Sequence, residues 1–131
     1  MKSLLILCAV FFQTNLFATV SNKEIKIELN QDKSVDHHSY YFGTVNVNLR
    51  TSVRYKVTNT GTTPLVFQKA LISGGSFDAR HSCRNGLLPN EVCSFTINYW
   101  PMFEGYHFGR FNLMFDQSSE IIVDVSGQAR R

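Results

Sequence analysis

Apolar and polar residues alternate with a period of two in five separate segments of the chain. Because successive side chains of a β-strand point to opposite faces, this alternation places one face in a core and the other in water. The pattern predicts antiparallel strands. Beyond the first 18 residues, no segment has an amphipathic helical pattern of useful length. The predicted inward positions are Ile25, Ile27 and Leu29; Val53, Tyr55 and Val57; Cys93, Phe95, Ile97 and Tyr99; Phe111, Leu113 and Phe115; and Ile121, Val123 and Val125.

Turn-forming residues separate these segments. Several short strands with turns at such spacing predict a sandwich or a small barrel. We expect Asn59 and Gly61 to tolerate positive φ in their turn, and Gly127 to end the last strand. The turn signals are Asn59-Thr60-Gly61, Gly74-Gly75, Asn85-Gly86, Glu104-Gly105 and Gln117-Ser118-Ser119.

Two segments are harder to assign. In Leu65–Ile72, apolar residues occur in both phases, which predicts a strand with both faces partly covered. The stretch Gln31–Ser39 is polar and contains His37-His38, and it is interpreted as a loop.

The N-terminal residues have the features of a secretory signal peptide. Lys2 precedes an apolar run, Leu4–Phe12, and Ala18 offers a cleavage site. A lipoprotein signal ending at Cys8 is the alternative, but Leu7 is too bulky for that position. We therefore expect a signal over residues 1–18, an N-terminal strand and polar loop over 19–39, and a sandwich over 40–131, together one structural unit from 19 to 131.

Export determines what the cysteines do. Cys8 would be removed with the signal, which leaves Cys83 and Cys93. Two cysteines in an oxidising compartment are expected to pair. The phase of the strand at Cys93 places this disulfide largely inside the core. The predicted location is secreted or periplasmic, and no membrane insertion is expected after signal cleavage.

Six short motifs follow one another in a characteristic order: Phe42-Gly43-Thr44-Val45, Val57–Leu65, Ser73–Phe77, Leu88–Cys93 with Cys83 ahead of it, Trp100-Pro101, and Ile122–Gly127. Between Tyr40 and Gly127 the chain resembles the immunoglobulin-like domains of the ASPM–SPD-2–Hydin (ASH) group, in particular the bacterial "choice-of-anchor D" version. The resemblance implies an all-β, immunoglobulin-like β-sandwich of seven to eight antiparallel strands, related to the major sperm protein fold, with one disulfide. It implies a binding or assembly module with no catalytic residue and no cofactor, although a fold alone does not fix function.

The chain departs from this family pattern after Trp100-Pro101, where small polar residues are usual. An aromatic hairpin follows instead, and enrichment in aromatic residues, Met and Arg is typical of interface hot spots. The alternative is that these side chains cap the open end of the core. The candidate partner-binding residues are Trp100, Met102, Phe103, Tyr106, Phe108 and Arg110.

Other chemistry has weaker support. The net charge is +3 and basic residues are scattered, so a nucleic-acid partner is not expected. A metal site would need convergent ligands. Of the histidines, His81 stands two residues before Cys83, but that cysteine is assigned to the disulfide. No Gly-x-Ser-x-Gly or His-Glu-x-x-His motif occurs, and an enzyme is not expected.

The strands Glu24–Asn30 and Glu120–Gly127 are candidate sheet edges, and edge strands can capture peptides by strand addition. The sequence thus predicts a non-catalytic secreted or periplasmic module that engages a protein or glycan partner through the aromatic hairpin or an edge strand. The alternative is a structural subunit of an envelope or surface assembly, in which the chain would associate with itself.

Overall fold

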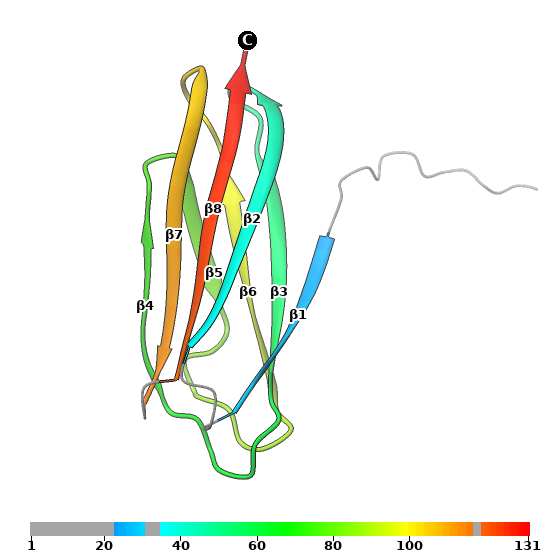
Figure 1. Ribbon diagram of the computed structural model, residues 1–131, viewed down its shortest axis with the longest axis vertical. Helices are drawn as coiled ribbons and strands as arrows, with labels where there is room; N and C mark the ends of the chain where they lie inside the picture. Colours follow the sequence, from blue (N-terminus) through cyan, green and yellow to red (C-terminus); the bar gives the residue numbers. More distant parts are fainter. Residues whose placement is uncertain (1–22, 31–34, 117–118) are drawn as a thin grey trace, which may run out of the picture.

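Two four-stranded sheets pack face to face in the computed structural model, which describes residues 23–30, 35–116 and 119–131 (Figure 1). The predicted signal over residues 1–18 lies outside this part of the chain. The strands are β1 (Lys23–Leu29), β2 (Val35–Asn46), β3 (Thr51–Asn59), β4 (Phe67–Ser73), β5 (Phe77–His81), β6 (Val92–Tyr99), β7 (Gly105–Phe115) and β8 (Glu120–Arg130).

The predicted all-β sandwich is confirmed. One sheet, here sheet A, has the order β1-β3-β6-β5, and the other, sheet B, has the order β2-β8-β7-β4. Strands β1 and β3 pair in parallel, as do β2 and β8, so the antiparallel prediction is wrong at these two positions. The reason is topological: β1 and β2 lie in different sheets, and parallel neighbours require a crossover instead of a tight hairpin.

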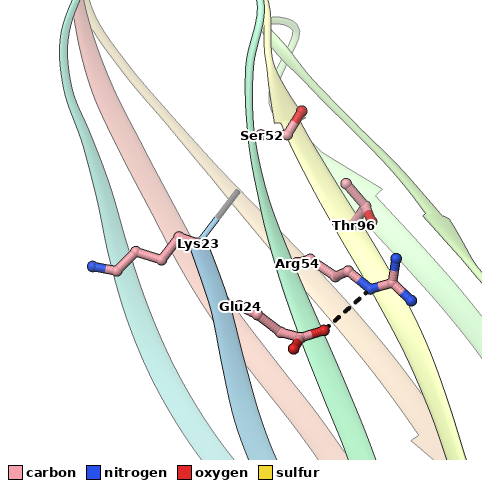
Figure 2. A pocket seen from close by; sticks show the side chains of 5 residues that line it. All are labelled: Lys23, Glu24, Ser52, Arg54 and Thr96. Carbon is pink, nitrogen blue, oxygen red and sulfur yellow. Dashed lines mark ion pairs between the residues drawn. The ribbon is translucent and has the colours of Figure 1, made fainter. Parts of the chain in front are cut away.

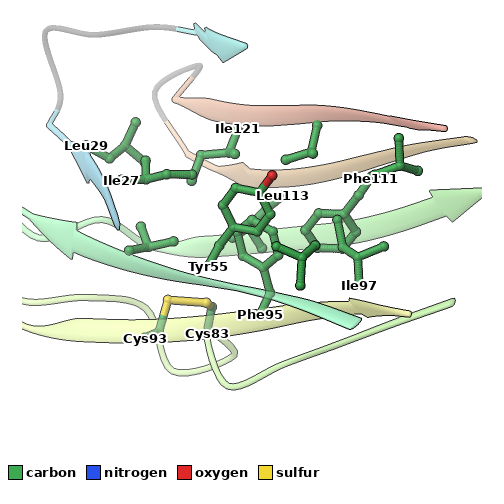
Figure 3. Packing of buried hydrophobic residues seen from close by; sticks show 14 of the residues in the cluster. Ile27, Leu29, Tyr55, Cys83, Cys93, Phe95, Ile97, Phe111, Leu113 and Ile121 are labelled. Atoms are coloured by element: carbon green, nitrogen blue, oxygen red, sulfur yellow. A yellow bond between two sulfur atoms is a disulfide. The ribbon is translucent and has the colours of Figure 1, made fainter. Parts of the chain in front are cut away.

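The five alternating segments supply the core, as predicted (Figure 3). Aromatic rings form its centre. The ring centroids of Tyr55 and Phe95 are 4.8 Å apart and those of Phe95 and Phe111 4.7 Å. Contacts between rings at such distances add stability beyond the area they bury. Tyr55 and Phe95 come from sheet A and Phe111 from sheet B, so these rings pack the two sheets against each other.

Tyr55 makes the core sensitive to alkaline pH. Its hydroxyl is buried with no hydrogen-bond partner among the described residues. Burial, with a smaller contribution from Tyr40, raises the pKa of Tyr55 from 10.0 to about 12. A raised pKa means that the unfolded chain loses this proton first, so the stabilising effect is complete below pH 10 and is lost as the pH rises towards 12.

We therefore expect the wild type to lose about 2 kcal/mol more stability than Tyr55→Phe between pH 10 and pH 12. Urea unfolding of both proteins at several alkaline pH values measures this difference. Parallel pH curves for the two proteins would show that Tyr55 ionises normally in the folded state.

A register shift explains the ambiguous segment Leu65–Ile72. A β-bulge lies between Phe67 and Lys69, and it reverses the phase of the strand. Phe67, Ala70 and Ile72 consequently all pack against the core, while Leu71 is exposed. The prediction of two partly covered faces is wrong, because a bulge lets both phases of the sequence serve one face.

The predicted loop over Gln31–Ser39 is wrong from Val35 onwards, where β2 already begins. His37 and His38 are strand residues that pair with Ile122 and Val123 of β8. The segment is polar because β2 is an edge strand with one face in water.

The turn at Asn59 works differently from the prediction. Positive φ among non-glycine residues is found at Asn48 and Asn90, not here, and Gly61 also has an ordinary φ. Asn59 is instead fully buried. Its side-chain amide donates to the carbonyl oxygens of Thr63 (2.9 Å) and Leu87 (3.0 Å). The turn is therefore fixed by the hydrogen bonds of a buried side chain and not by a positive φ.

Gly127 does not end the last strand, which continues to Arg130. It lies inside β8 because the ring of Tyr99 occupies the space next to it. A Cβ at position 127 would lie 2.3 Å from Tyr99 Cε2. The glycine therefore serves the packing between the two sheets and not a turn.

The predicted disulfide joins Cys83 and Cys93, with a Cα–Cα distance of 5.1 Å. Both residues are buried in the core, as the phase of β6 predicts (Figure 3). The bridge ties the connection after β5 to the start of β6.

Strands β1, β5, β2 and β4 lie at the sheet edges. The prediction for Glu24–Asn30 is confirmed, because β1 is an edge of sheet A. The prediction for Glu120–Gly127 is wrong, since β8 lies between β2 and β7. Its long run of alternating apolar residues is what a strand in the middle of a sheet requires.

Candidate binding surface

The outer face of sheet A is polar. Lys23, Glu24, Ser52, Arg54 and Thr96 line a shallow pocket of about 400 Å³ there (Figure 2). Glu24 and Arg54 form an ion pair at 3.5 Å, and both side chains are about half exposed. Exposed pairs of this kind contribute little. This face is typical of a solvated surface.

The outer face of sheet B carries aromatic rings. The register places Phe108 of β7 beside Ser126 of β8, and Ser126 beside Tyr41 of β2. Phe108 is 71% exposed and Tyr41 54%. Tyr106, two residues before Phe108 on the same face of β7, is also exposed. Three rings therefore stand in water on one side of the sandwich, with the small Ser126 between two of them.

A charged group borders these rings. Arg110 pairs with Asp124 across β7 and β8, with distances of 2.7 Å from Nε to Oδ1 and 3.2 Å from Nη2 to Oδ2. His37 Nε2 lies 2.6 Å from the second oxygen of Asp124. The hydrogen bond from Arg110 is the main cause that lowers the pKa of Asp124. The carboxylate thus holds Arg110 in a fixed orientation beside the rings.

The predicted aromatic hairpin divides into two parts. Tyr106, Phe108 and Arg110 lie on β7 and face outward from sheet B. Trp100, Met102 and Phe103 lie in the connection between β6 and β7, at the end of the sandwich. All five apolar side chains are exposed, so the alternative that they cap the core is wrong. That they bind a partner stays a prediction.

Tyr41 also belongs to this surface, although its sequence context does not predict that. Tyr40-Tyr41-Phe42 has no polar alternation, and its neighbours in the sheet come from the far end of the chain. Tyr40 and Phe42 pack against the core, which leaves Tyr41 on the opposite face. The parallel pairing of β2 with β8 is the missing information.

The histidines serve separate local contacts. His81 Nδ1 accepts a hydrogen bond from the backbone N–H of Cys83 at 3.1 Å, and burial, followed by the charge of Arg84, lowers its pKa. His107 Nδ1 lies 2.7 Å from the hydroxyl of Tyr99. In the described part of the chain, no three His, Cys, Asp or Glu side chains are grouped to hold a metal ion.

Comparison with known proteins gives one family and several structures. A model of the "HYDIN/CFA65/VesB-like, Ig-like domain" matches residues 29–128. No curated protein matches the sequence. None of residues 23–30, 35–116 and 119–131 belongs to a helix long and apolar enough to cross a membrane.

Three solved structures contain a similar domain. The VesB protease of Vibrio cholerae matches with a TM-score of 0.60 and 13% identity, over 70% of this chain and 30% of that one. The secreted serine protease VesC of the same organism has a TM-score of 0.55 and 12% identity, over 68% and 21% of the two chains. A family 123 glycoside hydrolase from Clostridium perfringens has a TM-score of 0.52 and 12% identity, over 70% and 23%. The present chain thus spans less than a third of each, and these identities show the fold alone.

Proposed function

Because the chain belongs to the HYDIN/CFA65/VesB-like Ig-like domain family, we propose that it is a non-catalytic, extracytoplasmic module that binds a protein partner through the outer face of sheet B. Membership of this family confirms the resemblance to ASH-type immunoglobulin-like domains. Such domains are typically binding or assembly modules, and fold membership leaves the partner open.

The observation that carries the proposal is the contrast between the two outer faces. Sheet A presents charged and hydroxyl side chains, whereas sheet B presents the exposed rings of Tyr41, Tyr106 and Phe108. Water in contact with these rings would be released on binding. Aromatic residues and Arg are enriched in interface hot spots. Arg110, which pairs with Asp124, lies two residues after Phe108 on the same face of β7.

Three observations support an extracytoplasmic location. The Cys83–Cys93 bridge is buried in the core, and disulfides persist in oxidising compartments but are rare in the cytosol. The apolar run Leu4–Phe12 has the composition of a signal peptide. A similar domain also occurs in a protein described as a secreted serine protease.

The charged residues of sheet B support a non-catalytic role. Asp124 is shared between Arg110 and His37, and the group lies on the outer face of a sheet instead of in an enclosed cleft. Exposure to water weakens every electrostatic contribution that catalysis would need. The cluster is suited to orient Arg110 towards a partner.

The test compares partner binding by two double variants of the exported protein. Tyr41→Ser with Phe108→Ser is expected to weaken binding about 30-fold or more, the effect of losing hot-spot aromatics. Lys26→Ser with Lys56→Ser, on the outer face of sheet A, is the matched control and is expected to bind within about twofold. Affinity capture followed by surface plasmon resonance with the captured partner measures both.

Three outcomes would contradict this proposal. Equal loss in both variants would place the contact elsewhere, and binding to glycan arrays without a protein partner would change the ligand class. Concentration-dependent self-association in sedimentation, abolished by Tyr41→Ser with Phe108→Ser, would indicate the structural subunit instead. Melting temperatures within a few degrees of the wild type establish that both variants are folded.

A further inference from the structure

One end of the sandwich carries apolar side chains on loops instead of on a sheet. Leu49 in the connection between β2 and β3, and Trp100, Met102 and Phe103 in the connection between β6 and β7, are exposed, Phe103 to 74%. These four residues are called the apolar tip. Figure 1 shows the ends of β2 and β8 and the start of β7 at this end, together with the last residues of the chain.

The two loops of the apolar tip are joined by hydrogen bonds. The backbone N–H of Asn48 donates to the carbonyl oxygen of Pro101 at 2.8 Å. The indole N–H of Trp100 donates to the carbonyl oxygen of Asn48 at 3.2 Å. Asn48 has a positive φ of 73°, which turns the chain so that Leu49 projects outward. The two loops and the indole of Trp100 are therefore held together, so the backbone of the apolar tip needs little further ordering when its side chains are buried.

The segments that form this end of the sandwich contain more basic than acidic side chains. Among the side chains of segments 47–50, 100–104 and 130–131 there are three guanidinium groups, of Arg50, Arg130 and Arg131, and one carboxylate, of Glu104. The guanidinium of Arg50 lies 5.1 Å from the ring centroid of Trp100, while Glu104 pairs with Arg131 at 3.4 Å. The side chains of these segments thus carry a net positive charge, and Arg50 lies directly beside the apolar ring of Trp100.

We propose that the apolar tip docks into the surface of a bilayer that contains anionic phospholipids. Side chains that protrude from two loops bury their apolar area readily in a fluid lipid layer, which conforms to them. Tryptophan is favoured at the boundary between headgroups and acyl chains. Arginines near an anionic surface add attraction. The sandwich stays outside the bilayer, with its long axis directed towards it, and the outer face of sheet B remains free.

This inference goes beyond the proposed binding function and does not depend on it. The chain has one tryptophan, Trp100, and it belongs to the apolar tip, so its fluorescence reports docking directly. The exported protein is titrated with vesicles of equal amounts of phosphatidylglycerol and phosphatidylcholine. The expected result is a blue shift of the emission and quenching by brominated acyl chains. Phosphatidylcholine alone is expected to give neither.

Variants separate the apolar tip from the rest of the chain. Met102→Ser with Phe103→Ser is expected to lower the partition coefficient about tenfold or more, and Arg130→Gln to lower it about fivefold on anionic vesicles. Phe108→Ser, on the sheet face, is the matched control and keeps vesicle binding. All variants share one N-terminus, so residues before β1 contribute equally to each.

Two results would overturn the inference. One is an unchanged Trp100 emission with anionic vesicles. The other is vesicle binding that persists in Met102→Ser with Phe103→Ser, which would assign the contact to another part of the chain. The two tests are independent. If vesicle binding fails, the proposed partner binding by sheet B still stands, and if the sheet B variants bind normally, docking of the apolar tip still stands.

Discussion

Gly127→Ala is expected to destabilise the protein by about 3 kcal/mol, because the added methyl group has no space. Its Cβ would lie 2.3 Å from Cε2 and 2.7 Å from Cζ of Tyr99. Tyr99 cannot easily move away, since its ring stacks on Phe77 at 4.9 Å and its hydroxyl contacts His107. The midpoint of urea unfolding, followed by circular dichroism, measures the change.

A matched substitution and a double-mutant cycle isolate the cause. Gly75→Ala adds the same methyl group where nothing lies within 4 Å and φ is not positive, so it is expected to change stability by less than about 0.5 kcal/mol. In a Tyr99→Ala background, Gly127→Ala should cost much less than in the wild type, because the clash is gone. A cost that is unchanged in that background would refute the packing explanation.

Removal of the disulfide is the second large effect. Cys83→Ala with Cys93→Ala is expected to cost about 2–3 kcal/mol, the value for a short closed loop, because the unfolded chain regains conformational freedom. The bridge spans a sequence separation of 10 and both cysteines are buried. Urea unfolding of the oxidised wild type, the reduced wild type and the double variant measures it.

The reduced wild type and the double variant are expected to unfold at similar urea concentrations, and both below the oxidised protein. Intact-mass measurement without reductant gives the redox state of the exported chain: the bridge makes it lighter by the two thiol hydrogens. Free thiols in protein recovered from an oxidising compartment would contradict the assignment. A double variant as stable as the oxidised protein would show that the bridge has no stabilising effect.

The core could be predicted from the sequence because each inward residue is specified locally. Alternation requires only that one face of the strand is apolar, and the structure buries the alternate positions Val53, Tyr55, Val57, Phe111, Leu113 and Phe115. The cysteine pair was predictable by elimination, since assigning Cys8 to a signal peptide leaves Cys83 and Cys93 as a single pair. The resemblance of the segment from Tyr40 to Gly127 to ASH-type immunoglobulin-like domains then indicated which kind of sandwich the strands form.

The errors share one physical origin, which is contact between residues distant in the sequence. The polar sequence of β2 is compatible with a loop until β8 pairs with it in parallel. Gly127 has the properties of a strand terminator until the ring of Tyr99 is placed beside it. The bulge after Phe67 is likewise fixed by the register against β7. None of these contacts leaves a local pattern.

The candidate surface was predictable only in part. The residues Met102–Arg110, after Trp100-Pro101, depart from the family pattern, and that departure was visible in the sequence. Their division into a flat part on sheet B and an apolar tip depends on where β7 begins, at Gly105. Tyr41 joins the flat part only through the intervening strand β8.

Site-specific photo-crosslinking in an exporting host tests the proposed binding face most directly. A benzoylphenylalanine at position 108 replaces one exposed ring by another, and the same residue at position 56, on the outer face of sheet A, is the control. We expect position 108 to crosslink to a discrete partner protein and position 56 to give no such product. Crosslinks from position 56 alone, or identical products from both positions, would contradict a binding face on sheet B.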